Sequence, residues 1–203
     1  PYYDALLRGC ALEQARDLLA YRVAPDFEAP RVMRRLAESI SGQVRVRPLN
    51  RRDKARELEI LRDIFNDAWS QNYGFVPFTV EEFNDVGKLM TLLLPADYVQ
   101  IAEVDGEPAA FIVAMPNIND VTAGLRGRLL PLGWLRLLWG VKVRHPRSAR
   151  VPLMGVRRKF QQSRLGPGLA FMVIDAVRKG LCARGVREVE LSWILEDNAG
   201  MRS

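Results

Sequence analysis

The chain has 203 residues, of which 48% are hydrophobic and 27% are charged. These proportions are those of globular proteins, and they exclude a disordered chain. The length suits one full hydrophobic core and part of a neighbouring one. The formal net charge of +6 favours anionic partners, such as a phosphate-bearing cofactor, nucleic acid or acidic lipid, without choosing among them.

Cysteine and histidine are scarce, which narrows the kinds of site to expect. Cys10 and Cys182 are the only cysteines, and His145 is the only histidine. Two distant cysteines make no disulfide framework and suit a reducing compartment. A zinc site needs more such ligands, so we expect no metal. The first residues lack the basic segment and apolar run of a secretion signal, so the expected location is the cytoplasm.

The first 43 residues are expected to form the tail of a preceding domain and a linker. Tyr3, Leu6 and Leu7 are at helical spacing, and a second element is expected over residues 18–23. Prolines and charges then lead into a short helix. Because the chain starts without Met and stops after a strand-to-turn signal, we expect both of its ends to be cut from a longer protein.

Residues 44–203 are expected to form the main domain. Residues 44–47 alternate apolar and charged side chains, which predicts a strand. Asn50 and Asp53 have the spacing of a capping box, and an apolar stripe at helical spacing follows. Its members are Leu58, Leu61, Ile64, Phe65, Ala68 and Trp69. A second helix is expected from Thr79, with Glu82 at the box position, to about Leu93.

The rest of the domain predicts a mixed α/β sheet. Two β-prone runs, residues 98–104 and 107–115, flank Asp105-Gly106, a strong hairpin signal because both residues tolerate positive φ. A strand over 151–156, a helix ending at Gly185 and a strand over 186–194 then predict a parallel βαβ unit. The expected fold is therefore an antiparallel hairpin followed by a parallel crossover.

Residues 154–170 join the predicted strand to the helix through a basic loop and a Gly-x-Gly pair. Amides and the positive dipole end at a helix N-terminus bind anions, and glycines let a diphosphate approach the backbone. The loop cations would add contacts to phosphate. They are Arg157, Arg158, Lys159 and Arg164. The alternative interpretation is a tight strand–helix turn with a solvated basic loop.

This order of elements resembles the GNAT acyltransferase superfamily over residues 44–203. That family carries Arg/Gln-x-x-Gly-x-Gly/Ala in this loop; Gly166 and Gly168 match its glycines, whereas Ser163 and Pro167 depart from the pattern. The resemblance implies that acetyl-CoA or another acyl-CoA binds as co-substrate. The implied binding residues are Met154, Gly155, Val156, Arg164, Leu165, Gly166, Pro167, Gly168, Leu169, Ala170 and Asn198. For Asn198, a plain helix N-cap is the alternative.

Residues 1–23 also resemble the end of a GNAT domain, which implies a fragment of a two-domain protein. The matching positions are Tyr3, Leu6, Leu7, Gly9, Ala20 and Tyr21. By the same resemblance, the main domain is truncated at its C-terminus, and the tyrosine that commonly acts as general acid would lie beyond Ser203.

The resemblance implies an N-acyltransferase in which a primary amine, on a small molecule or a peptide, attacks the acyl-CoA directly. The amine must lose a proton to a base. Glu196 is the first candidate because it follows a parallel strand, where open α/β sheets place ligands, and Glu103 on the hairpin is the second. The alternative is a non-catalytic module that binds acyl-CoA or packs against a partner domain.

Residues 124–150 form an unusual basic and apolar segment without an acidic residue. Residues 129–141 are apolar except for Arg136, and the run is too short to span a membrane. Three interpretations stay open: a lid helix over the acceptor site, an interfacial membrane helix, or a docking face for a partner domain or a second copy. We expect no nucleic-acid partner, because Trp and Leu outnumber the polar groups that track phosphates.

Overall fold

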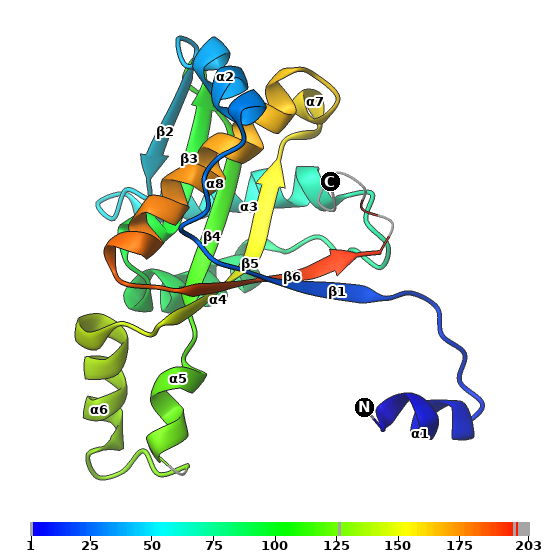
Figure 1. Cartoon of the computed structure of the whole chain (residues 1–203), viewed down its shortest axis with the longest axis vertical. Coiled ribbons are helices and arrows are strands. Elements are labelled where there is room, and N and C mark those ends of the chain that lie inside the picture. The colour runs from blue at the N-terminus through cyan, green and yellow to red at the C-terminus, as the bar shows by residue number, and fades with distance from the viewer. Residues whose placement is uncertain (1, 126, 197, 199–203) are drawn as a thin grey trace.

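The computed structural model describes residues 2–125, 127–196 and 198. Within these residues the strands form one six-stranded mixed sheet in the order β1-β6-β5-β4-β3-β2 (Figure 1). The strands are β1 Leu18–Val23, β2 Val44–Pro48, β3 Val99–Val104, β4 Glu107–Pro116, β5 Ser148–Val156 and β6 Glu188–Leu195. Neighbouring strands are antiparallel except for the parallel pair β5 and β6.

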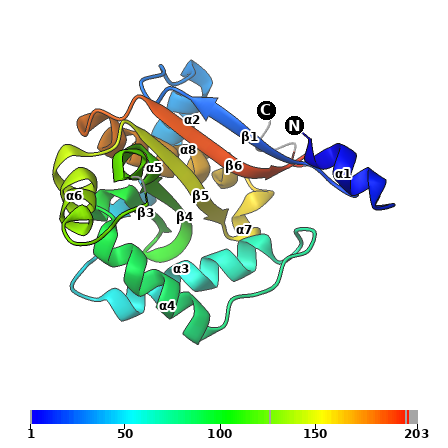
Figure 2. The same cartoon turned by 90° about the horizontal axis from the view of Figure 1, so that it is seen from below.

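Helices cover both faces of the sheet. The helix α2, Arg31–Ile40, and the helix α8, Leu165–Ala183, lie on one face, while α3, Lys54–Trp69, and α4, Val80–Leu93, lie on the other (Figure 2). The shorter helices are α1 Tyr3–Gly9, η1 Ala96–Tyr98, α5 Asn119–Thr122, η2 Ala123–Leu125, α6 Gly133–Trp139, the π-helix η3 Gly140–Arg144, and α7 Arg158–Gln161. The predicted mixed α/β architecture is confirmed.

The hairpin and the crossover form where the sequence predicts them. Asp105 and Gly106 join β3 to β4 with φ angles of 50° and 86°, which a two-residue hairpin turn requires. The helix α8 joins the parallel strands β5 and β6, and Gly185 follows the helix with a φ of 74°. The chain thus places the end of β5 next to the start of α8, through the short helix α7.

The core has two parts, one on each face of the sheet. Residues 109–114 of the central strand β4 are all buried, and they read as a continuous apolar run because helices cover both faces. On one face, α8 buries Leu169 and Val173 completely. On the other, α3 buries Leu61 and Ile64 of the predicted apolar stripe.

One of the two predicted capping boxes forms and the other does not. Thr79 and Glu82 make the reciprocal bonds of a box at the start of α4. The box predicted at Asn50 and Asp53 is wrong, because α3 starts only after Asp53, which makes no side-chain cap. The amide of Asn50 instead donates to Glu57 Oε2 at 3.1 Å. A buried carboxylate on α3 therefore fixes the end of β2 against the helix.

The N-terminal segment takes part in the same layers as the main domain. Strand β1 pairs with β6 along its whole length, and α2 packs on α8, where a Cβ on Gly168 would lie 2.4 Å from Ile40 Cδ1. The helix α1 buries none of its residues and stands apart from the sheet (Figure 1). The predicted domain boundary between residues 43 and 44 stays a prediction.

Candidate functional site

The parallel strands β5 and β6 pair over only part of their length. Their register runs from Ser148 opposite Glu188 to Val151 opposite Leu191. Beyond these positions both strands continue, as residues 152–156 and 192–195, and they diverge (Figure 1). We call these two diverging segments the fork. Strands that separate leave backbone groups on their facing edges without a ladder partner, so the fork is where a ligand could bind the backbone.

Two carbonyls of β5 face the fork and accept hydrogen bonds from side chains. Met154 O accepts from Trp69 Nε1 at 2.9 Å, and Val156 O accepts from Gln161 Nε2 at 2.8 Å. The next residue, Arg157, donates its amide to Ala109 O of β4 at 2.8 Å. Because backbone groups alternate between the two edges of a strand, Met154 and Val156 point to the edge away from β4. The end of α3 and the helix α7 therefore cover carbonyls that a ligand could use.

Ser192 is the first residue of β6 in the fork, and it carries a buried polar atom. The residue is 6% exposed, and its hydroxyl makes no hydrogen bond of good geometry in the described part of the chain. The nearby Glu190 carboxyl has a lowered pKa, first because Arg150 Nη2 donates to it at 2.5 Å and to a smaller extent because of the Ser192 hydroxyl. The Ser192 hydroxyl thus lies close to the Glu190 carboxylate, beneath the surface of the fork.

The first turn of α8 does not present the open amides that the sequence predicts. The amide of Leu165 donates to Ser163 Oγ at 3.2 Å, and the amide of Gly166 donates to Ser163 O at 3.2 Å. Pro167 has no N–H. Ser163, which stands at the Arg/Gln position of the GNAT pattern, therefore satisfies these amides itself, and the predicted amide cradle is closed in this structure.

Helix packing accounts for both glycines of the Gly-x-Gly pair. A Cβ on Gly166 would lie 2.6 Å from Phe160 O at the end of α7, and a Cβ on Gly168 would lie 2.4 Å from Ile40 Cδ1 on α2. The contact at position 166 is with backbone and excludes a side chain there, whereas a Cβ at position 168 would require the terminal methyl group of Ile40 to move. The interpretation as a tight strand–helix turn thus explains these two residues.

The four cations of the loop differ in what they contact. Arg157 Nε donates to Pro108 O at 2.8 Å, and Lys159 Nζ lies 2.5 Å from Glu107 Oε1, which lowers the pKa of that carboxyl. Arg158 and Arg164 are exposed and make no ion pair within the described residues. These two arginines flank the turn between α7 and α8, and they can contact the phosphates of an anionic ligand.

The remaining predicted binding residues have different surroundings. Gly155 is buried, and a Cβ there would lie 2.9 Å from Phe111 Cε1, so it serves the packing of β5 on β4. Leu169 is completely buried in the core, so its side chain is not available to a ligand. Leu165 and Ala170 are half-buried near the start of α8, and Pro167 is exposed there.

The two predicted bases lie in different parts of the sheet. Glu196 directly follows β6 at the end of the fork, and its Oε1 accepts from the Asp17 amide at 3.3 Å while its own amide donates to Asp17 O at 3.2 Å. Asn198 donates its amide to Leu195 O at 3.0 Å, so it stays close to the same strand end. The start of β1 therefore holds Glu196 beside the fork.

Glu103 lies on β3, beyond β4 and β5, and it is part of a structural ion-pair network. Its Oε1 is 2.7 Å from Arg47 Nε, and Arg47 Nη1 is 2.7 Å from Glu57 Oε2. The structure does not bring Glu103 together with Glu196, and its carboxylate is committed to Arg47. We therefore do not carry Glu103 into the proposed mechanism.

Sequence reasoning missed three residues at the fork: Trp69, Gln161 and Ser192. Trp69 was grouped with the apolar stripe of α3, although its indole N–H needs an acceptor when the ring is covered. Gln161 and Ser192 carried no pattern that distinguishes them from other polar residues. Their roles depend on contacts between segments far apart in the chain.

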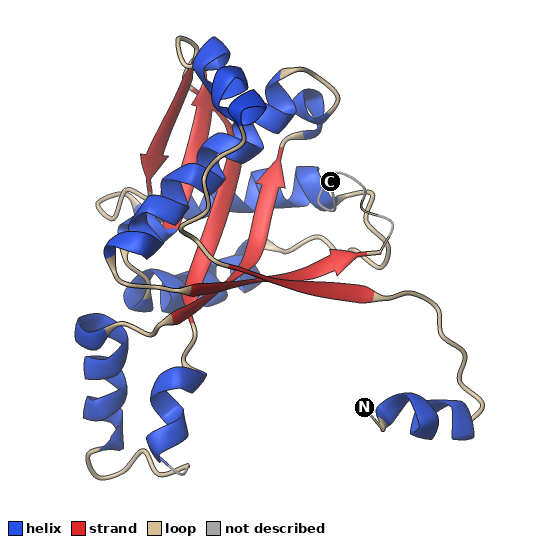
Figure 3. Cartoon of the chain, in the orientation of Figure 1, coloured by secondary structure: helices blue, strands red, loops and turns tan. Residues whose placement is uncertain are grey.

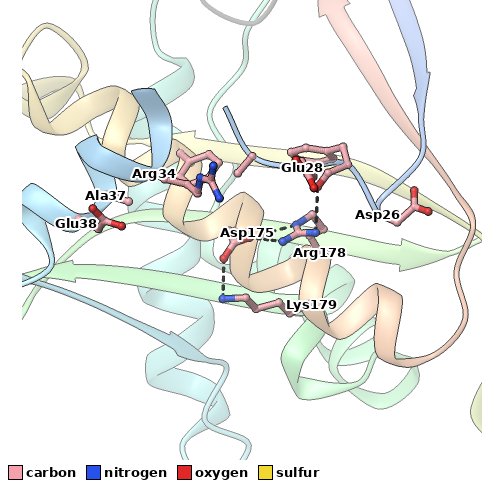
Figure 4. Close-up of a pocket in the computed structure, with 11 residues that line it drawn as sticks. Asp26, Glu28, Arg34, Ala37, Glu38, Asp175, Arg178 and Lys179 are labelled. Carbon is pink, nitrogen blue, oxygen red and sulfur yellow. Dashed lines mark hydrogen bonds and ion pairs between the residues drawn. The ribbon is translucent and has the colours of Figure 1, made fainter. Parts of the chain in front are cut away.

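A separate groove of about 640 Å³ lies between α2, α8 and residues 26–29 (Figure 4). Three of its charged side chains pair on α8: Asp175 lies 2.7 Å from Arg178 and 2.7 Å from Lys179, while Arg178 Nη1 donates to Phe27 O at 3.4 Å. Burial alone would raise the pKa of Asp175, but the hydrogen bonds from Lys179 and Arg178 outweigh it and lower that pKa. This cluster ties the linker to α8.

Comparison with known proteins places the fold. No protein-family model matches the chain. It is 44% identical to "Protein YghO" of Escherichia coli (strain K12) over 204 residues, which cover all of this chain and 52% of that protein. It is 39% identical to "Bacterial ceramide synthase" of Caulobacter vibrioides over 205 residues, which cover 98% of this chain and 53% of that protein. The chain thus spans about half the length of these curated relatives.

Solved structures show the same architecture. A GCN5-related N-acetyltransferase from Sphaerobacter thermophilus matches 97% of this chain and 48% of its own, with a TM-score of 0.57 at 15% identity. The glucosamine N-acetyltransferase region of a fungal multi-domain β-N-acetylglucosaminidase matches 98% of this chain and 21% of its own, also with a TM-score of 0.57, at 13% identity. None of the described helices is long and apolar enough to cross a bilayer. The chain has the fold of the GCN5-related N-acetyltransferases, the GNAT superfamily.

Proposed function

We propose that the chain belongs to an N-acyltransferase that transfers an acyl group from acyl-CoA to a primary amine. The observation that carries the proposal is the fork, which opens beside two exposed arginines in a chain of GNAT fold. The fork offers backbone carbonyls and nearby cations, and these groups suit the amides and phosphates of coenzyme A. The chain spans about half the length of its curated relatives. The activity that we assign to the whole protein is therefore itself a proposal.

The identity of the relatives suggests the substrate class. A ceramide is the amide of a fatty acid and a long-chain amino alcohol, and one relative of 39% identity is named a bacterial ceramide synthase. We therefore favour a long-chain amino alcohol as the acceptor and a long acyl-CoA, rather than acetyl-CoA, as the donor. The cytoplasm, where acyl-CoA and reduced cysteines are found, is the location that we propose.

Each group at the fork would have a separate role in the proposed reaction. Acyl-CoA supplies the activated thioester. Arg158 and Arg164 would bind its phosphates, and the carbonyls of Met154 and Val156 would accept N–H groups after Trp69 and Gln161 turn away. Glu196, held by the Asp17 amide, would take the proton of the attacking amine. A carbon–nitrogen bond forms and the carbon–sulfur bond breaks. The sulfur leaves as a thiolate and takes up one proton to become the thiol of coenzyme A, which balances the proton that the amine loses.

The test is the release of free thiol from acyl-CoA by the intact protein. Palmitoyl-CoA and acetyl-CoA are offered with and without sphinganine, and the amide product is identified by mass spectrometry. The proposal predicts thiol release that needs both substrates and is lower with acetyl-CoA. A glutamine at position 196 should reduce turnover by about 100-fold or more, while CoA binding stays unchanged.

The second candidate function is a module that binds acyl-CoA, or packs against a partner domain, without catalysis. The specific observation in its favour is that Ser163 closes the first-turn amides of α8 and that Pro167 offers none. Binding of CoA without turnover across a panel of amines would support this alternative. Absence of both binding and turnover would overturn the acyl-CoA proposal altogether.

A further inference from the structure

A helical arm, residues 117–125 and 127–147, projects from the end of the sheet between β4 and β5. It contains α5 and α6, which lie side by side beyond the strands (Figures 1 and 3). The helix α5 packs closely on the start of η3, which directly follows α6, since a Cβ on Gly140 would lie 2.3 Å from Val121 Cγ1. The base of the arm is fixed, because Asp120 Oδ2 accepts from the Ser148 amide at 3.1 Å and from its hydroxyl at 2.8 Å. The arm is thus an ordered projection.

The arm exposes large apolar side chains that nothing in the described chain covers. Leu130 is 80% exposed, Leu132 is 66% exposed and Trp139 is 63% exposed. The exposed set also contains Leu129, Trp134, Leu135, Leu138 and Val143. Clustered exposure on this scale in a folded protein marks a surface that binds something apolar.

Apart from Asp120 at its base, all charged side chains of the arm are positive. Residues 121–150 contain seven arginines and lysines and no acidic residue. Among the described ones, Arg150 pairs with Glu190 on β6. Five others are exposed and have no ion pair within the described residues. They are Arg128, Arg136, Lys142, Arg144 and Arg147.

We propose that the arm binds the surface of an anionic phospholipid bilayer, with its leucines and tryptophans in the headgroup region and its cations on the lipid phosphates. Apolar and basic residues on one helical segment are the features of interfacial binding, and tryptophan prefers that interface. An anionic leaflet attracts each nearby cation. A second copy of this chain fits less well, because two such arms would bring like charges together.

The position of the arm also fits a bilayer. The arm enters β5 at Ser148, whereas the turn with Arg158 and Arg164 follows the other end of the same strand. A nine-residue strand separates the two ends by roughly 25–30 Å. A bilayer bound to the arm would therefore leave the fork end in water, where a soluble anionic ligand could reach it. Membrane binding by the arm does not depend on the proposed reaction. Because the arm and the α7–α8 turn lie at opposite ends of β5, the arm's position does not support a lid over that turn.

The test is co-sedimentation of the intact protein with vesicles, without any acyl-CoA present. Vesicles of phosphatidylcholine mixed with phosphatidylglycerol are compared with vesicles of phosphatidylcholine alone. We expect binding to the anionic vesicles that weakens as salt rises. The Trp134→Ala/Trp139→Ala variant should bind at least about 10-fold more weakly. Removing three cations, as R136Q/K142Q/R144Q, should weaken binding by about 5-fold for each charge.

Matched control variants test whether vesicle binding depends on the arm itself or on the charge and exposed apolar surface of the whole protein. The variant R31Q/R35Q/R45Q removes three exposed arginines outside the arm, and Trp193→Ala removes a tryptophan that is 68% exposed on β6. Both should bind the anionic vesicles like the wild type. Equal binding by arm and control variants, or no binding of the wild type at low salt, would overturn the proposal.

A second measurement needs no change in the arm. In a W69F/W193F background the two remaining tryptophans, Trp134 and Trp139, both lie in the arm. Their emission should shift to the blue with anionic vesicles and be quenched by brominated lipid. Sedimentation equilibrium of the wild type and of the Trp134→Ala/Trp139→Ala variant is run in parallel. If the wild type does not bind vesicles but forms a reversible dimer, and the variant does not form it, the arm serves self-association instead.

Discussion

The indole N–H of Trp69, at the end of α3, donates a 2.9 Å hydrogen bond to the carbonyl of Met154 on β5. This bond satisfies a carbonyl that the separation of β5 from β6 leaves without a ladder partner. In the proposed enzyme the same carbonyl accepts an N–H of acyl-CoA. Trp69 therefore both stabilises the free protein and competes with the ligand.

Replacing Trp69 with phenylalanine should separate these two effects. Phenylalanine keeps the packing on Phe65, whose ring centroid lies 5.0 Å from that of Trp69, but it loses the N–H. We expect the free energy of unfolding to fall by about 1–2 kcal/mol. The affinity for desulfo-CoA should rise about 5-fold, since about 1 kcal/mol no longer opposes binding.

Urea denaturation and calorimetry measure the two quantities. Trp193→Phe is the control for stability alone, because Trp193 lies in the fork; since it is exposed, its replacement should change the free energy of unfolding by less than about 0.5 kcal/mol. A Trp69→Phe variant that binds desulfo-CoA more weakly than the wild type would show that the indole does not compete with the ligand.

A side chain at position 168 should destabilise the protein even in the absence of ligand. In Gly168→Ala the new Cβ would lie 2.4 Å from Ile40 Cδ1, so the Ile40 side chain must leave its present position or α2 must move from α8. We expect a loss of about 1–3 kcal/mol in the free energy of unfolding. Because the clash is with one methyl group, Ile40→Val in the same chain should recover part of the loss. If the double variant is no more stable than Gly168→Ala, the clash does not explain this glycine.

The network of Arg47, Glu57 and Glu103 should contribute strongly to stability. Glu57 is only 3% exposed, so Arg47→Met would leave a buried carboxylate without its cation. We expect a loss of about 3 kcal/mol. Arg22→Met is the control, because Arg22 and Glu188 lie 3.6 Å apart with side chains 74% and 50% exposed, and its effect should stay below about 1 kcal/mol. Similar losses in chemical denaturation of the two variants would contradict this account.

The Asp175 cluster predicts a specific pH dependence. The folded protein lowers the pKa of Asp175 below its ordinary 3.8, so the ionised carboxylate stabilises the fold above that pH. This contribution is lost as the pH falls through the lower folded-state value. Asp175→Asn should therefore be less stable than the wild type at neutral pH, by about 1 kcal/mol for this partly exposed cluster. The difference should narrow below pH 3.8, whereas a constant gap in urea denaturation down to acid pH would exclude this linkage.

Local patterns were enough to predict most of the fold. Asp105-Gly106 requires positive φ at both positions, and the apolar stripe of α3 has a helical period, so each signal lies within a few neighbouring residues. The order hairpin, strand, helix, strand then allows few topologies. The pairing of β1 with β6 was not predicted, because strand partners far apart in sequence leave no local signal.

The candidate site was less predictable for the same reason. The Gly-x-Gly pair predicted an open amide cradle, but Ser163 closes it, and the close contact at position 168 comes from Ile40, on a helix far away in the sequence. Glu196 was found from its place after a parallel strand, yet the contact that holds it comes from Asp17, at the start of β1. The chemistry of a segment is thus visible in the sequence, while its partners depend on the tertiary structure.

The central claim is that the fork and its arginines bind acyl-CoA, and calorimetric titration of the intact protein with desulfo-CoA tests it most directly. The account predicts binding that weakens at least about 10-fold in Arg158→Ala/Arg164→Ala, since each cation contacts phosphate. The matched variant Arg31→Ala/Arg45→Ala, which removes two exposed arginines elsewhere, should bind like the wild type. No binding to the wild type, or equal weakening in both variants, would contradict the claim.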